Sequence, residues 1–95
     1  MAAYVIVDVK VTDPAGYEKY KQLAPAAIAR HGGRYLARGG KCVVLEGDAQ
    51  PNRVVVLEFP DLDAARRWYD SAEYRAACEL REGAAEVRMI AVEGV

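Results

Sequence analysis

Four charged residues lie inside segments that otherwise read as β-strands: Asp8, Arg38, Glu58 and Arg88. A carboxylate held against a substrate can accept a proton, and a guanidinium can bind the oxygens of a carboxylate or enolate with parallel hydrogen bonds. One interpretation is a polar floor in which Arg38 binds an anionic group while Asp8 or Glu58 accepts a proton. The alternative is a structural network of ion pairs, because charges on a buried face must be compensated.

The only histidine and a set of aromatic residues are further candidates for a site. His31 stands at the end of a predicted helix, where the partial negative charge favours a protonated imidazole, so it is a candidate base or proton shuttle. The alternative for His31 is a partly exposed helix cap. Tyr4, Tyr35 and Trp68, with Tyr69 beside the tryptophan, are candidates for an aromatic ligand pocket, and core packing is the alternative for all of them.

Motifs for metals and common cofactors are missing. A single histidine cannot build a His-rich site, the cysteines Cys42 and Cys78 are too far apart for a C-x-x-C pair, and no H-E-x-x-H or EF-hand loop occurs. The segment 39–42 holds a lysine after two glycines but lacks the spacing and the following helix of a phosphate-binding loop. Neither G-x-G-x-x-G nor G-x-S-x-G is present. We therefore expect neither a metal nor a bound cofactor.

Hydrophobic periodicity places these candidates on short strands. A period of two, typical of strands, runs through residues 4–11, and residues 34–38 also read as strand. Residues 53–59 and 86–92 read as strands with apolar residues at both parities. After a bend at Gly39-Gly40, residues 42–45 read as strand again. One long broken strand and a small hairpin both fit this segment.

Helical segments separate the strands. Asp13-Pro14 predicts the start of the first helix, because proline fits the first helical position, and Gly32-Gly33 predicts its end. Pro25 removes a backbone hydrogen bond within it, which predicts a kink or a division into two pieces. Asp61 predicts the cap of the second helix, and Ser71 can cap a further helical stretch.

The order of these elements predicts an α+β fold, a ferredoxin-like βαββαβ protomer whose four-stranded antiparallel sheet carries its helices on one face. Alternation places five aliphatic residues on the other, bare face: Ile6, Val54, Val56, Ile90 and Val92. Burial of each is worth about 1.5 to 3 kcal/mol, so together they match a domain's net stability of about 5 to 15 kcal/mol. The sequence therefore predicts a homodimer in which two sheets meet about a two-fold axis as a dimeric α/β barrel.

The composition is typical of one soluble globular domain over residues 1–95. Hydrophobic residues make up 53% of the chain and charged residues 28%, and no linker or low-complexity segment divides it. A net charge of -1 with scattered lysines and arginines argues against a nucleic-acid partner. The apolar run at the N-terminus is too short for a signal peptide or a membrane span. We expect a cytoplasmic protein that binds neither nucleic acid nor membrane.

From end to end the sequence resembles the domain-of-unknown-function 1330 family of the dimeric α/β-barrel superfamily. The stretches that carry the resemblance are Asp13-Pro14 with Tyr17 and Tyr20, Gly32-Gly33, Arg38-Gly39-Gly40, Leu45-Glu46-Gly47, Glu58-Phe59-Pro60, Trp68-Tyr69, Ser71 with Tyr74, and Arg81-Glu82-Gly83-Ala84. Membership would imply a ferredoxin-like protomer and a sheet-to-sheet dimer. It would imply no reaction, because the family's function is not established.

Superfamily relatives that the sequence resembles in fold alone include cofactor-free monooxygenases, muconolactone-type isomerases and haem-degrading enzymes. An analogy of fold does not carry a function, because function depends on the site. The haem-degrading relatives use an asparagine with a histidine and a tryptophan. The only asparagine here, Asn52, lies in a predicted turn, so we do not expect haem.

Two functions follow as hypotheses. The first is a homodimer that binds or transforms a small anionic or aromatic organic molecule without a cofactor, with Arg38 orienting the anionic group and His31, Asp8 or Glu58 available for proton transfer. The second is a non-catalytic dimerisation module with a packed interior, so the sequence leaves open whether the chain is an enzyme. A pocket of about 300 Å³ or more lined by Arg38 and aromatic residues favours the first hypothesis. A filled interior favours the second.

Overall fold

The helices and strands follow one another in the predicted order. In the computed structural model, which describes residues 1–95, they are β1 (Ala3–Val11), α1 (Pro14–Arg30), β2 (Arg34–Arg38), β3 (Arg53–Phe59), α2 (Leu62–Asp70), α3 (Ala72–Leu80) and β4 (Ala85–Glu93). The helical segment between β3 and β4 is divided at Ser71 into α2 and α3. The predicted α+β class and βαββαβ order are confirmed.

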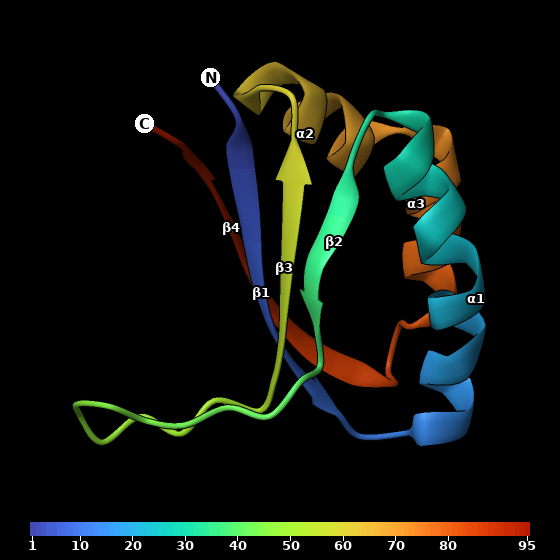
Figure 1. Ribbon diagram of the computed structural model, residues 1–95. Coiled ribbons are helices and arrows are strands. Elements are labelled where there is room, and N and C mark those ends of the chain that lie inside the picture. Colours follow the sequence, from blue (N-terminus) through green and yellow to red (C-terminus); the bar gives the residue numbers. More distant parts are fainter.

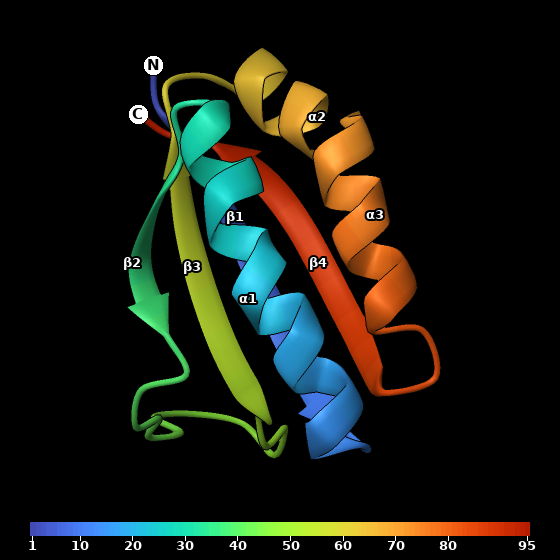
Figure 2. The same ribbon diagram turned by 90° about the vertical axis from the view of Figure 1, so that its right-hand side faces the viewer.

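The four strands form one antiparallel sheet in the order β2-β3-β1-β4. All three helices lie over the same face of this sheet (Figures 1 and 2). The core fills the space between the two layers, and the strands contribute to it at every second residue, such as Val5, Val7 and Val9 of β1.

Trp68 of α2 lies at the centre of this core and is 1% exposed. Its ring centroid is 5.2 Å from that of Phe59 on β3 and 4.3 Å from that of Tyr74 on α3. Gly33 allows the chain to leave α1 close to the core, because a Cβ there would lie 2.5 Å from the Phe59 ring. The aromatic packing therefore joins the sheet to α2 and α3.

Helix α1 runs unbroken through Pro25, so the predicted division into two pieces is wrong. Asp13 occupies the N-cap position without a side-chain hydrogen bond. Pro25 still has a local effect, because it has no N–H to donate to the carbonyl of Lys21, four residues earlier. One acceptor on the side of α1 is therefore left free.

The shorter helices α2 and α3 begin at their predicted caps. The Asp61 carboxylate accepts a hydrogen bond from the Ala64 amide at 2.7 Å, and the Ser71 hydroxyl accepts one from the Tyr74 amide at 3.2 Å. None of the three helices combines the length and apolar character needed to cross a membrane.

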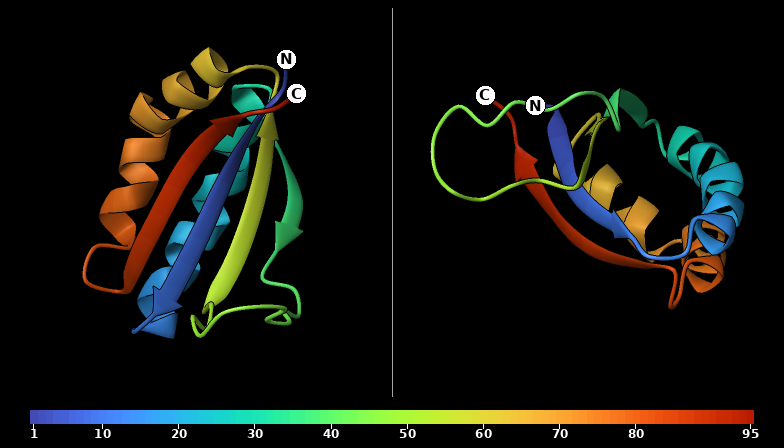
Figure 3. Two further views of the ribbon diagram at one scale, coloured as in Figure 1. Left: turned by 90° about the vertical axis from the view of Figure 1, so that its left-hand side faces the viewer. Right: turned by 90° about the horizontal axis from the view of Figure 1, so that it is seen from below.

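Residues 39–52 form a long arm between β2 and β3, and the predicted strand at 42–45 is absent. The Gly39 amide donates to the Val54 carbonyl at 2.8 Å, and the positive φ of Gly39, 70°, then turns the chain out of the sheet. The arm extends on the side of the sheet that faces away from the helices (Figures 1 and 3). Leu45 in this arm is 94% exposed.

The sheet face opposite the helices is uncovered and carries an apolar patch. It carries the five predicted aliphatic residues. In the strand register, for example, Ile6 lies opposite both Val56 and Ile90. Ile90 is 63% exposed, Val92 45% and Ile6 40%. We call this surface the open face.

Candidate functional site

A small cavity lies between α1 and the helix-facing side of the sheet. Its polar lining consists of Tyr17, Tyr20 and Lys21 from α1, Tyr35 and Arg38 from β2, and Arg53 from β3. Val7, Ala24, Ile28, Val55, Leu57, Trp68 and Met89 complete the walls. The volume is about 30 Å³, which is room for one or two water molecules. We call it the arginine–tyrosine cavity.

The positive charges of three arginines act on Tyr17, and two of these arginines, Arg38 and Arg53, line the cavity with it. Burial raises the pKa of Tyr17, and the positive charges of Arg53, Arg81 and Arg38 oppose this rise. The ion pairs of the structure join other residues: Lys21 with Glu18, Arg30 with Glu73, and Arg34 with Glu58. An anion in the cavity would compensate charges that the protein leaves uncompensated.

Arg38 is held at the cavity by α1 and by its own strand. Its Nη2 donates a hydrogen bond to the Lys21 carbonyl oxygen at 3.3 Å, the acceptor that Pro25 leaves free. Its guanidinium carbon lies 4.6 Å from the centroid of the Tyr35 ring, in cation–π contact. The proline in α1 therefore helps to position a candidate anion-binding residue.

Arg53, the first residue of β3, has a buried Nε without a hydrogen-bond partner. Gly39 makes room for its guanidinium, since a Cβ at that position would lie 2.7 Å from Nη1 of Arg53. A buried donor without a partner lowers stability. A ligand oxygen that accepts this hydrogen bond would remove the penalty.

Two phenols from different helices form a hydrogen bond beside the cavity. The hydroxyl oxygens of Tyr20 and Tyr74 lie 2.7 Å apart, and the guanidinium carbon of Arg81 is 5.1 Å from the Tyr20 ring centroid. Burial raises the pKa of Tyr20 well above its ordinary value and that of Tyr74 to about 12. Both phenols are therefore protonated at neutral pH, and they can donate hydrogen bonds to an anion but cannot act as bases.

We expect the protein to lose stability as the pH rises from 10 towards 12. The pKa of Tyr74 is 10.0 in the unfolded chain and about 12 in the folded chain. Above pH 10 the unfolded state therefore binds fewer protons than the native state, and the free energy of unfolding falls. Unfolding temperatures across this interval should fall less steeply in Tyr74→Phe than in the wild type. Equal slopes in the two proteins would contradict the assignment, because lysines titrate alike in both.

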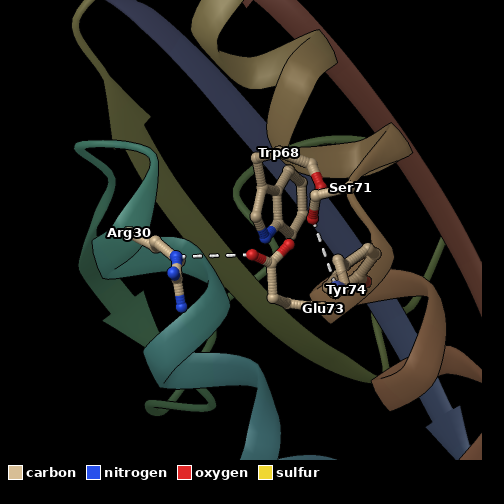
Figure 4. A network of polar contacts seen from close by, with 5 residues as sticks. All are labelled: Arg30, Trp68, Ser71, Glu73 and Tyr74. Carbon is tan, nitrogen blue, oxygen red and sulfur yellow. Dashed lines mark hydrogen bonds and ion pairs between the residues drawn. The ribbon is translucent and has the colours of Figure 1, made fainter.

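An ion pair and a helix cap hold the helices around Trp68. Arg30 of α1 pairs with Glu73 of α3, with Nε and Oε1 3.3 Å apart, and Ser71 caps α3 next to it (Figure 4). The ion pair joins α1 to α3, the two helices that supply Tyr20 and Tyr74, whereas the cap lies within α3.

A larger pocket of about 330 Å³ opens between α2 and the edge strand β4. It is lined by Val5, Ala65, Arg66, Trp68, Tyr69, Asp70, Met89, Ile90 and Ala91. Its volume falls at the lower end of the range for ligand pockets, about 300 to 1,000 Å³. We call it the α2–β4 pocket.

Arg38 does not share the open face with Asp8 and Glu58, the residues that the polar-floor interpretation groups with it. The register shifts between Tyr35 and Ala37, and this β-bulge sets Arg38 opposite Val55, whose side chain faces the helices. The structure therefore does not bring Arg38 together with Asp8 and Glu58 on one face of the sheet.

The other predicted charges do share the open face. Asp8 lies opposite Arg88 in the register, and its carboxylate accepts a hydrogen bond from the Asn52 amide at 2.9 Å. Glu58 accepts one from Nε of Arg34 at 2.7 Å. Asp8 and Glu58 are thus on the opposite side of the sheet from the arginine–tyrosine cavity.

The aromatic candidates and His31 are divided in the same way. Tyr35 and Trp68 line the arginine–tyrosine cavity with Arg38, whereas Tyr4 lies opposite Glu58 in the register, on the open face. His31 caps the end of α1, half-buried and with Nε2 unpartnered, and lines neither pocket. No three His, Cys, Asp or Glu side chains gather into a potential metal site.

Several polar residues around the cavity are not among the predicted candidates: Tyr17, Tyr20, Arg53, Tyr74 and Arg81. Two signals could have found some of them. Tyr17 and Tyr20 lie one helical turn apart. Arg53 has the same parity as the buried residues of its strand, which is unusual for a charged side chain.

Solved structures share this fold at low sequence identity. A protein of unknown function from Rhodopseudomonas palustris is 21% identical, with a TM-score of 0.75 over 99% of this chain and 82% of its own. SnoaB, a cofactor-independent oxygenase from Streptomyces nogalater, is 17% identical, with a TM-score of 0.67 over 99% and 93%. A dimeric protein of unknown function with a ferredoxin-like fold from Bacteroides fragilis is 17% identical, with a TM-score of 0.58 over 98% and 96%. These likenesses show the ferredoxin-like fold.

A family model also matches the chain. The family described as domain of unknown function (DUF1330) matches residues 2–95. No curated protein matches the chain.

Proposed function

Because this chain belongs to the domain of unknown function 1330 family, whose description assigns no reaction, we propose a function from its own site. The chain forms a homodimer that binds a small organic anion in the arginine–tyrosine cavity without a bound cofactor. The observation that carries this proposal is that Arg38 and Arg53 line the cavity beside Tyr17 and that neither is paired with an acid.

The cavity suits a carboxylate, enolate or phenolate. Arg38 and Arg53 supply guanidinium donors, and the protonated phenol of Tyr20 can donate a hydrogen bond. Such donors would stabilise negative charge on an oxygen during a reaction as well as in a ground-state ligand. His31, Asp8 and Glu58 lie outside the cavity, so we assign proton donation to the tyrosines instead. SnoaB, which shares the fold, makes cofactor-independent oxygenation a reaction class to assay once a ligand is found.

Ligand entry requires a side-chain movement. The cavity of about 30 Å³ is smaller than any organic anion. Arg38 is exposed and Lys21 partly so, and both are long, flexible side chains that can move.

The small volume favours the second candidate, a non-catalytic dimerisation module with a packed interior. The experiment below separates this module from the anion-binding protein.

The open face supports the homodimer. Exposed Ile6, Ile90 and Val92 form an apolar surface that a second copy of the sheet can cover. The arm of residues 39–52 extends on the same side, with Val43 70% exposed and Leu45 94% exposed, where it can contact that second copy. The Bacteroides fragilis protein of the same fold is dimeric.

A thermal-shift screen against small carboxylates, phenols, lactones and haem tests the binding proposal. We expect a carboxylate or a phenol to raise the unfolding temperature by several degrees. Arg38→Gln should lose this shift while its elution volume stays that of the dimer, because Arg38 lies on the helix-facing side of the sheet.

The matched control is Arg67→Gln, which removes an exposed positive charge of α2 that lines neither pocket. This variant should respond to the ligand as the wild type does. A wild type that responds to no compound in the panel would contradict the binding proposal and support the packed module.

A further inference from the structure

Building on the proposed function, we infer that the arginine–tyrosine cavity and the α2–β4 pocket are two halves of one ligand site separated by the side chain of Met89. The ligand is an organic anion with an elongated apolar body. Its charged group binds at Arg38 and Arg53, and its body extends past Met89 into the α2–β4 pocket.

The two spaces share one wall, formed by Trp68 and Met89. Trp68 is fixed, since it is 1% exposed and packs against Phe59 and Tyr74. Met89 on β4 is only half-buried, and an unbranched thioether changes rotamer readily. Movement of Met89 therefore joins the two spaces without disturbing the core.

The two halves differ in chemistry as the two ends of an amphipathic anion do. The first holds guanidinium and phenol donors but has a volume of only about 30 Å³. The second is apolar along most of its wall, with Val5, Ala65 and Ala91, and has about 330 Å³. Its two charged residues, Arg66 and Asp70, are exposed and of opposite sign, so they favour no net charge in the ligand. The larger pocket thus supplies the volume that the anion-binding half lacks.

Calorimetric titration with straight-chain alkanoates from butanoate to decanoate tests this inference. In the wild type each methylene that enters the α2–β4 pocket should tighten binding about fourfold, which corresponds to roughly 0.8 kcal/mol per buried CH₂. Decanol should bind far more weakly than decanoate, because it has no charge to pair with the arginines.

Two variants act on the shared site in opposite directions. Ala91→Phe fills the α2–β4 pocket from an exposed position of β4, so it should remove the dependence of affinity on chain length while butanoate still binds. Met89→Ala removes the dividing side chain and should tighten the binding of decanoate more than that of butanoate. If one of these two variants is unstable, the other still tests whether the two spaces form one ligand site.

The outcomes separate the two proposals. If butanoate binds through Arg53 but longer alkanoates bind no more tightly in any variant, the joined site is overturned and the proposed function stands. Alkanoates of every length that fail to bind would overturn the joined site, and the thermal-shift panel then decides the proposed function separately. A chain-length dependence that Ala91→Phe abolishes would support the joined site.

Discussion

Replacement of Ile90 by aspartate is expected to convert the proposed dimer into a folded monomer. Ile90 is 63% exposed in the single chain and lies on the open face, so the substitution leaves the core between sheet and helices intact. A two-fold axis places two aspartates in the interface, and burial of each costs about 2 kcal/mol or more. The dimer dissociation constant should rise at least about 1,000-fold, at about 1.4 kcal/mol per factor of ten.

Sedimentation velocity over a concentration series measures this change, and far-ultraviolet circular dichroism reports whether the monomer is folded. Leu23→Asp is the matched control, because Leu23 is also exposed, at 46%, but lies on α1. The control should remain dimeric. A dimer that survives Ile90→Asp unchanged would place the interface elsewhere and leave the open face without a partner.

Most of the fold follows from sequence periodicity. Apolar residues at both parities of residues 53–59 and 86–92 predict strands that are covered on two faces, and helices on one face leave the other for a partner. The register confirms this pattern residue by residue, with Ile6, Val56 and Ile90 side by side on the open face. Local alternation was sufficient because each strand is short and nearly regular.

Two local features could not be predicted in this way. The bulge after Tyr35 adds one residue to β2, and a shift of one residue moves every later side chain to the other face, which is why Arg38 does not join Asp8 and Glu58. Val43 and Val44 have high strand propensity, but β3 begins at Arg53 and no strand lies opposite them. Strand pairing, a tertiary property, decided both cases.

The candidate site was harder to predict than the fold. Tyr20 and Tyr74 are 54 positions apart in the chain, and only the packing of α1 against α3 brings their hydroxyls into contact. The hydrogen bond from Arg38 to the Lys21 carbonyl likewise depends on where α1 crosses the sheet. The sequence supplied Arg38, Tyr35 and Trp68 as candidates, but only the structure shows that they share a cavity with Arg53.

Arg53→Gln is expected to stabilise the ligand-free protein and weaken anion binding. The Nε of Arg53 is buried without a partner, and no acid pairs with its charge. Removal of such a group should add about 1 kcal/mol of stability, which raises the unfolding temperature of a small domain by about 4 to 8 °C. Affinity for the best carboxylate of the panel should fall by about 10- to 100-fold, because a charge-assisted hydrogen bond is lost.

Arg34→Gln provides the contrast, since Arg34 has an acid partner in Glu58 at 2.7 Å and lies on the opposite side of the sheet. We expect its unfolding temperature to stay within a few degrees of the wild type, because exposed ion pairs contribute about 1 kcal/mol or less, and its ligand affinity to be unchanged. If Arg53 were a structural residue, Arg53→Gln would unfold at a lower temperature with no selective loss of binding. Opposite changes in stability and affinity at Arg53 would instead identify a charge that is held unpaired for a ligand.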